Sequence, residues 1–169
     1  MKTKRIAIDG MLAAMCAVLG YIAIDMQVIK ITFESLPVIL GALMFGPLDG
    51  LAVGGIGTLI YQLLKYGVSA TTLLWILPYC VLGVVLGLYA KKHNFRNTPK
   101  QILIAVVIEE LVVTIMNSGV IYLDSVIYHY YFPGIVTGNL LIRLGICIVK
   151  GIVFGLVVPK LTTAVKRAI

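Results

Sequence analysis

Apolar segments make up most of this chain, and only short polar breaks separate them. Six segments are candidates for helices, at residues 6–24, 33–45, 49–64, 72–90, 101–121 and 134–163. A helix crosses a bilayer with about 20 mostly apolar residues. With 60% hydrophobic and 12% charged residues, the chain is far more apolar than a soluble domain, where about a quarter of residues are charged. We therefore predict an all-α fold, a polytopic membrane protein whose single domain, residues 1–169, is a compact bundle of six transmembrane helices.

The basic residues predict how this bundle lies in the membrane. Ten of them lie in three segments on one side: Lys2, Lys4, Arg5, Lys91, Lys92, Arg96, Lys100, Lys160, Lys166 and Arg167. The breaks on the other side hold only Lys30 and Lys65. Because lysine and arginine concentrate in cytoplasmic segments, we expect both termini to be cytoplasmic. The net charge of +7 does not indicate a nucleic-acid partner, since these cations are spread over several gaps rather than gathered on one face.

Polar residues recur at helical spacing within the last two apolar segments. Their positions form one stripe on each helix: Glu110, Thr114, Asn117 and Asp124, then Asn139, Arg143, Ile146 and Lys150. In hydrocarbon such stripes must face protein or a wet cavity. At about 1.5 Å per residue, Glu110 and Lys150 lie at a similar depth, so we predict a structural ion pair. An intramembrane enzyme that uses them as acid and base is the alternative.

Arg143 has no acidic residue at its own depth in these two segments. A buried cation needs a partner, and a guanidinium binds carboxylates through two parallel hydrogen bonds. The sequence therefore predicts that Arg143 binds a carboxylate of a ligand, near the shallower Asn117 and Asn139. The alternative is that Arg143 bonds Asn117, Tyr122 or backbone carbonyls.

Aromatic and polar residues flank the break before residue 72. Gln62 and Tyr66 share one helix face, and Trp75 and Tyr79 share another, with Thr71 between the two helices. Rings with a few fixed donors and acceptors suit a flat heteroaromatic ligand. We predict a pocket here, with Lys65 and Lys30 at its outer edge. For the later tyrosines an interfacial aromatic belt is favoured instead: Tyr122, Tyr128, Tyr130 and Tyr131.

The sequence lacks the motifs of enzymes and metal sites. It has no HExxH, no GxSxG, no nucleotide-binding glycine loop and no paired aspartates for a metal-dependent transferase,. We therefore predict no catalytic residue, no metal and no cofactor. A transporter built on this chain would draw its energy from ATP bound elsewhere.

Small residues follow one line on the first helix, where Ala13 and Ala17 lie four apart. Small residues at this spacing let another helix approach closely. The approaching helix could belong to another subunit or to this chain, and the spacing alone does not distinguish them.

Two runs add a family resemblance to these features. They are Lys30-Ile-Thr-Phe-Glu-Ser-Leu-Pro37 and, after it, Phe45-Gly-Pro-Leu-Asp-Gly-Leu-Ala-Val-Gly54. In this order, after the small-residue line, they resemble the substrate-binding S components of energy-coupling factor (ECF) vitamin importers of the bacterial plasma membrane. The resemblance implies an outward-facing vitamin pocket, docking of Ala13 and Ala17 to a transmembrane coupling subunit, and two ATPase subunits that bind ATP.

The run from Leu64 to Trp75, Leu-Lys-Tyr-Gly-Val-Ser-Ala-Thr-Thr-Leu-Leu-Trp, is similar to folate-specific members. The resemblance implies folate as the vitamin: Trp75, Gln62 and Asn117 would bind a pterin, and Arg143, Lys65 or Lys30 the glutamyl carboxylates. Pantothenate would need the cation without the aromatic slot. Riboflavin or thiamine would need the slot without a dedicated cation, and niacin is a further alternative.

Overall fold

The structure is a computed structural model, and it describes residues 2–26, 29–137 and 140–168. Its long helices are α1 (Lys2–Tyr21), α2 (Ser35–Phe45), α3 (Pro47–Tyr66), α4 (Thr72–Lys92), α5 (Pro99–Ile127) and α7 (Leu140–Ala168). The remaining elements are short: β1 (Ile24–Met26), β2 (Ile29–Ile31) and α6 (Gly134–Thr137).

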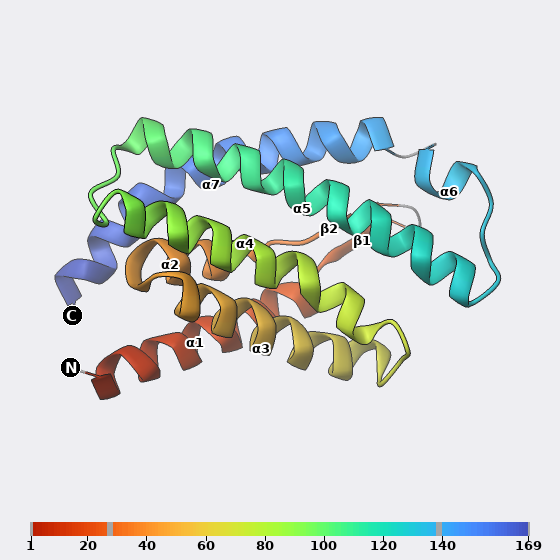
Figure 1. The fold of residues 1–169 in the computed structure, drawn as a ribbon, viewed down its shortest axis with the longest axis horizontal. Coiled ribbons are helices and arrows are strands. Elements are labelled where there is room, and N and C mark those ends of the chain that lie inside the picture. Colours follow the sequence, from red (N-terminus) through yellow and green to blue (C-terminus); the bar gives the residue numbers. More distant parts are fainter. Residues whose placement is uncertain (1, 27–28, 138–139, 169) are drawn as a thin grey trace.

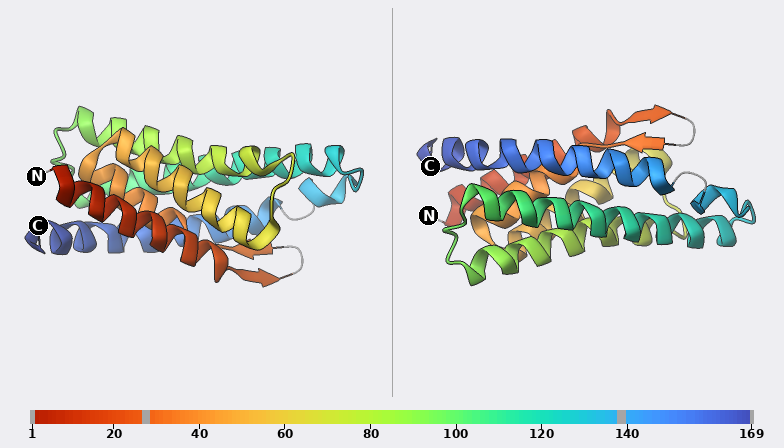
Figure 2. Two further views of the ribbon diagram at one scale, coloured as in Figure 1. Left: turned by 90° about the horizontal axis from the view of Figure 1, so that it is seen from below. Right: turned by 90° about the horizontal axis from the view of Figure 1, so that it is seen from above.

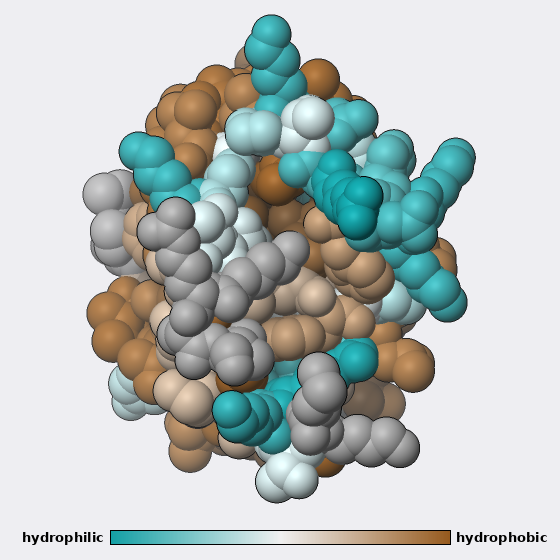
Figure 3. Space-filling model, turned by 90° about the vertical axis from the view of Figure 1, so that its left-hand side faces the viewer, coloured by the Kyte–Doolittle hydropathy of each residue, from teal (hydrophilic) through white to brown (hydrophobic). Residues whose placement is uncertain are grey.

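The long helices run back and forth along one axis and form an elongated bundle (Figures 1 and 2). The ends of α1 and α7 that carry the chain termini lie at one end, together with the turn between α4 and α5. The β hairpin, the α3–α4 loop and α6 lie at the opposite end. The three basic segments therefore gather at one end of the bundle, where the space-filling view shows hydrophilic side chains (Figure 3).

Four helices are long and apolar enough to cross a membrane: α3, α4, α5 and residues Leu140–Val165 of α7. Shorter α2 is apolar on all sides and packs against α1, α3, α4 and α7, as expected of a helix surrounded by protein. The predicted all-α, multi-helix membrane fold is confirmed.

The boundaries differ from the prediction at the end away from the termini. α5 continues six residues past the predicted end at 121, because no glycine or proline follows before Pro133. The predicted helix 134–163 is divided into α6 and α7, and the positions between them lie outside the described residues. The first break pairs as a hairpin, with Ile24 opposite Ile31.

Glycines bring α3 and α4 into backbone contact. A Cβ atom added to Gly83 would lie 2.3 Å from the carbonyl oxygen of Gly50, so only glycine allows this approach at the crossing. Gly46, the N-cap residue before α3, has a φ of 110°, a conformation that glycine adopts without strain. This close contact fixes α4, which carries Trp75 and Tyr79.

Candidate functional site

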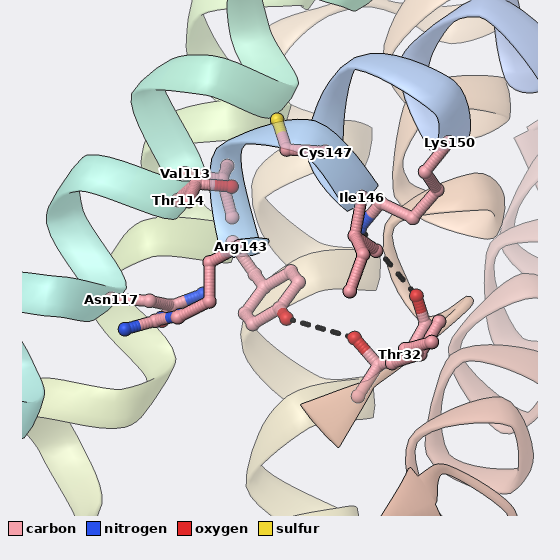
Figure 4. A pocket seen from close by; sticks show the side chains of 10 residues that line it. Thr32, Val113, Thr114, Asn117, Arg143, Ile146, Cys147 and Lys150 are labelled. Atoms are coloured by element: carbon pink, nitrogen blue, oxygen red, sulfur yellow. Dashed lines mark hydrogen bonds between the residues drawn. The ribbon is translucent and has the colours of Figure 1, made fainter. Parts of the chain in front are cut away.

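A polar seam joins α5 and α7 near the middle of the bundle. Lys150 Nζ lies 2.7 Å from Glu110 Oε2, so the predicted contact forms. Ser35 at the start of α2 donates a hydrogen bond of 2.5 Å to the other oxygen of Glu110. Lys150 also donates to the backbone carbonyl of Thr32, at 3.5 Å (Figure 4). The seam thus ties α2 and the hairpin side of the bundle to α5 and α7.

Arg143 lies about two helical turns from Lys150 on α7, toward the hairpin end. It lines a cavity (Figure 4). Its Nη1 atom is buried and has no hydrogen-bond partner among the described residues, and the same holds for Oδ1 of Asn117. A buried polar atom without a partner costs about 1–3 kcal/mol. The two side chains therefore offer a donor and an acceptor that a ligand in the cavity could satisfy.

Three adjoining cavities lead from this seam to the hairpin end of the bundle. The inner cavity, of about 70 Å³, is lined in part by Thr32, Tyr79, Asn117, Arg143 and Lys150. The middle cavity, of about 150 Å³, shares four of these and adds Glu34, Tyr61, Gln62, Trp75 and Ile121. The outer cavity, of about 300 Å³, is lined by Tyr61, Gln62, Tyr66, Ser69, Thr71, Trp75, Asp124 and Tyr128.

The predicted aromatic face forms the wall common to these cavities. Trp75 lines the middle and outer cavities, and Tyr79 lines the inner and middle ones. The Tyr79 hydroxyl lies 3.5 Å from the Thr32 hydroxyl. Gln62 is buried and presents its amide to the two larger cavities. Aromatic rings and polar side chains therefore line the same three adjoining cavities.

Asp124 connects the segments at the outer cavity. Its Oδ1 accepts hydrogen bonds from Thr71 at 2.5 Å and from the Trp75 indole nitrogen at 3.4 Å, and its Oδ2 accepts one from Tyr130. Burial, together with this hydrogen bond, raises the pKa of Tyr130 to about 12. Tyr128 accepts a bond from the Ala70 backbone at 3.2 Å. Tyr128 thus joins the α3–α4 loop to the end of α5, and Tyr130 bonds back onto α5. The aromatic belt stays a prediction for these tyrosines.

Of the remaining predicted ligand residues, Tyr66 and Lys65 lie at the margin of the site. Tyr66 lines the outer cavity but is 54% exposed. The Lys65 ammonium lies in the last turn of α3, 5.8 Å from the centroid of the Tyr66 ring. In the hairpin, the backbone of Lys30 lies opposite that of Asp25. The side chain of Lys30 and the whole of Asn139 lie outside the described residues.

Two acidic residues that line the cavities, Glu34 and Asp124, were not among the predicted ligand residues. Glu34, within the first motif of the family resemblance, lines the middle cavity. Asp124 was noted only as the end of the α5 stripe. Its spacing of seven residues from Asn117 places it on the helix face that lines the cavities, and this spacing is the signal that could have identified it.

The structure also shows how the small-residue line on α1 is used. Ala13 and Ala17 are 5% and 7% exposed, and a Cβ atom on Gly57 of α3 would lie 2.8 Å from the Ala13 carbonyl oxygen. Packing within this chain therefore accounts for both alanines, and their docking to another subunit stays a prediction. Ala7, Gly10 and Ala14 are small residues that α1 leaves exposed.

No group of three or more His, Cys, Asp or Glu side chains that could hold a metal ion is found within residues 2–26, 29–137 and 140–168.

Comparisons with known proteins identify the family. A family model described as "ECF transporter, substrate-specific component" matches residues 4–164. The solved structure described as "Structure and mechanism of the S component of a bacterial ECF transporter" is similar with a TM-score of 0.71 and 24% identity, covering 99% of this chain and 98% of that one. "Crystal structure of FolT bound with folic acid" is similar with a TM-score of 0.61 and 22% identity, covering 92% and 93%. A search of curated proteins finds no match. Because the family model spans nearly the whole chain, this membrane protein belongs to the substrate-specific components of ECF transporters.

Proposed function

We propose that this chain captures folate in an outward-facing pocket, with high affinity, and delivers it to the transport module of an ECF-type importer. The proposal rests mainly on one observation: adjoining cavities lined by Trp75, Tyr79 and Gln62 end at Arg143, whose buried Nη1 lacks a partner among the described residues. Folate has both chemical parts that such a site would bind, a flat pterin ring and acceptor oxygens.

The similar fold of FolT bound with folic acid supports folate over the other vitamins. Pantothenate has no ring to stack on Trp75. Riboflavin and thiamine have rings but no carboxylate for the basic residues of the site, and niacin would fill only part of the cavities. In this proposal the ligand is flanked by the rings of Tyr66, Trp75 and Tyr79. Hydrogen bonds come from the polar side chains Gln62, Thr71, Asn117 and Asn139. The oxygens of the ligand are bound by the basic residues Lys30, Lys65 and Arg143.

The proposed partners supply what the chain lacks. A transmembrane coupling subunit would dock on α1, and two ATPase subunits would bind ATP, so that this chain itself needs no cofactor. In the bacterial plasma membrane, the end with the basic segments and both termini would be cytoplasmic. The cavities at the opposite end would then open toward the exterior.

An enzyme that uses Glu110 and Lys150 is the second candidate, but their contacts favour a structural role. The two groups neutralise each other at 2.7 Å. Ser35 donates a further hydrogen bond to Glu110, and the backbone carbonyl of Thr32 accepts one from Lys150. The family, moreover, is one of substrate-binding transport subunits.

Equilibrium binding of folic acid to the purified chain tests the proposal. We expect Arg143→Ala to weaken binding by about 10- to 100-fold, because a hydrogen bond to a charged group contributes about 1.5–3 kcal/mol. Arg96→Ala, which changes an exposed arginine in the α4–α5 turn, is the control and should leave affinity unchanged. Absence of micromolar folate binding, or equal affinities of both variants, would contradict the proposal. Tighter binding of another vitamin would change the substrate, and conversion of the ligand would favour the enzyme.

A further inference from the structure

Glu34 is a buried carboxylate that faces the middle cavity. It occupies the N-cap position of α2, yet its side chain makes no capping hydrogen bond to that helix. It is 2% exposed and lines the cavity of about 150 Å³ together with Trp75, Asn117 and Arg143. A position that needed only a helix cap would favour Ser, Thr, Asp or Asn. Glu34 therefore lines the cavity without capping the helix.

The surrounding helices leave room for this carboxylate. A Cβ atom on Gly20 of α1 would lie 2.6 Å from Glu34 Oε2 and 2.9 Å from the Tyr61 ring. The Tyr79 hydroxyl lies beside the Glu34 carboxylate. Because α1, α3 and α4 all contribute to its position, Glu34 is held at a defined place on the cavity wall.

We propose that Glu34 binds the nitrogen edge of the ligand's ring, accepting hydrogen bonds from two adjacent N–H donors. This inference rests on the proposed function and names the part of the ligand that enters the middle cavity. The 2-amino-4-oxo ring of a pterin presents a ring N–H beside an amino group, and a carboxylate accepts from two such donors in parallel. Bonds of this charge-assisted kind are about twice as strong as neutral ones.

The same carboxylate selects against other flat rings. The pyrimidine edge of a flavin presents one N–H between two carbonyl oxygens, which would face the acceptor oxygens of Glu34 and be repelled. Guanine presents the same pair of donors as a pterin, so both ring systems share the required chemistry. Glu34 therefore selects rings that present two adjacent N–H donors.

This placement also gives Arg143 a defined role. A cavity of about 150 Å³ holds about one small aromatic ring, and both Glu34 and Arg143 line it. A ring bonded to Glu34 would offer its 4-oxo group to Arg143. The benzoyl-glutamyl part would then extend along Trp75 into the outer cavity, which is lined by Tyr66, with Lys65 beside that ring.

Two ligands and two matched variants test the proposal. Affinities of wild type, Glu34→Gln and Glu109→Gln are measured for folic acid and for its analogue with a methyl group in place of the 2-amino group. We expect wild type to prefer folic acid by about 10- to 100-fold and Glu34→Gln to lose most of this preference. Glu109→Gln makes the same chemical change at a buried residue of α5 that lines none of the three cavities, and it should keep the preference.

The outcomes separate this inference from the proposed function. If wild type binds folic acid and Glu34→Gln keeps the full preference, the inference is overturned and folate capture stands. Should Glu34→Gln fail to fold, equal binding of the two ligands by wild type would overturn it in the same way. If wild type binds guanosine rather than folic acid, and Glu34→Gln abolishes that binding, the donor pattern is supported and folate is rejected. Binding of neither ring compound would overturn both.

Discussion

The contact between α3 and α4 and the contact between α5 and α7 differ in what separates the helices. At Gly50 and Gly54 of α3, an added Cβ atom would lie 2.5 Å from a carbonyl oxygen of α4, so the two backbones touch. Between α5 and α7, the half near the chain termini is close-packed at Gly155 and Leu103. The other half contains the ion pair and the inner cavity. Backbone contact makes α3 and α4 a fixed support, and polar side chains on α5 and α7 keep space open for a ligand.

Breaking the ion pair should give the largest effect and tests whether the polar contact also holds the helices together. Lys150→Met leaves the fully buried Glu110 without its cation, which we expect to cost about 3–5 kcal/mol of unfolding free energy. The measurement is the unfolding midpoint in detergent. Lys160→Met, at an exposed position of the same helix, should have little effect. Recovery of most of the loss in a Glu110→Gln, Lys150→Met double variant would assign it to the unpaired charge, whereas an unchanged single variant would contradict a structural role.

Filling the α3–α4 contact should give the next effect. In Gly83→Ala the new methyl group meets the Gly50 backbone at 2.3 Å, and overpacking of this kind costs about 1–3 kcal/mol. Gly119→Ala is the matched control, since nothing lies within 4 Å of a Cβ atom there, and it should be neutral or slightly stabilising. Thermal unfolding of the two variants compares them directly. Equal stability would mean that backbone contact does not make α3 and α4 rigid.

The smallest effect concerns the outer extension of α5, where Tyr130 bonds Asp124. Since the folded pKa of Tyr130 is raised to about 12 from an ordinary value near 10, its contribution to stability is complete below about pH 10. It is lost as the pH rises toward 12. Ultraviolet titration of the phenols should show that Tyr130→Phe removes a group that ionises near pH 12. Asp124→Asn should lower the pKa of Tyr130. If the phenol that disappears in Tyr130→Phe instead titrates near pH 10, the hydrogen bond to Asp124 is contradicted.

Much of the site could be predicted because helical spacing fixes which residues share a face and at what depth. This is why Glu110 and Lys150 were paired correctly, and why Trp75, Tyr79, Asn117 and Arg143 were expected on the same pocket. The predicted ligand set left out Asp124 and Glu34, because helical spacing does not show contacts between one element and the loops beside it. Asp124 bonds the loop before α4, and Glu34 precedes its helix, where no periodicity applies.

The sequence by itself determined the membrane class, the helical segments, the polar stripes and the family, since hydrophobicity and spacing act along the chain. Only the tertiary structure decided that Ala13 and Ala17 face α3, that Glu34 and Arg143 line one cavity, and that Asp124 joins three segments. Those arrangements depend on how closely helices cross, and glycine contacts between distant parts of the chain set that distance.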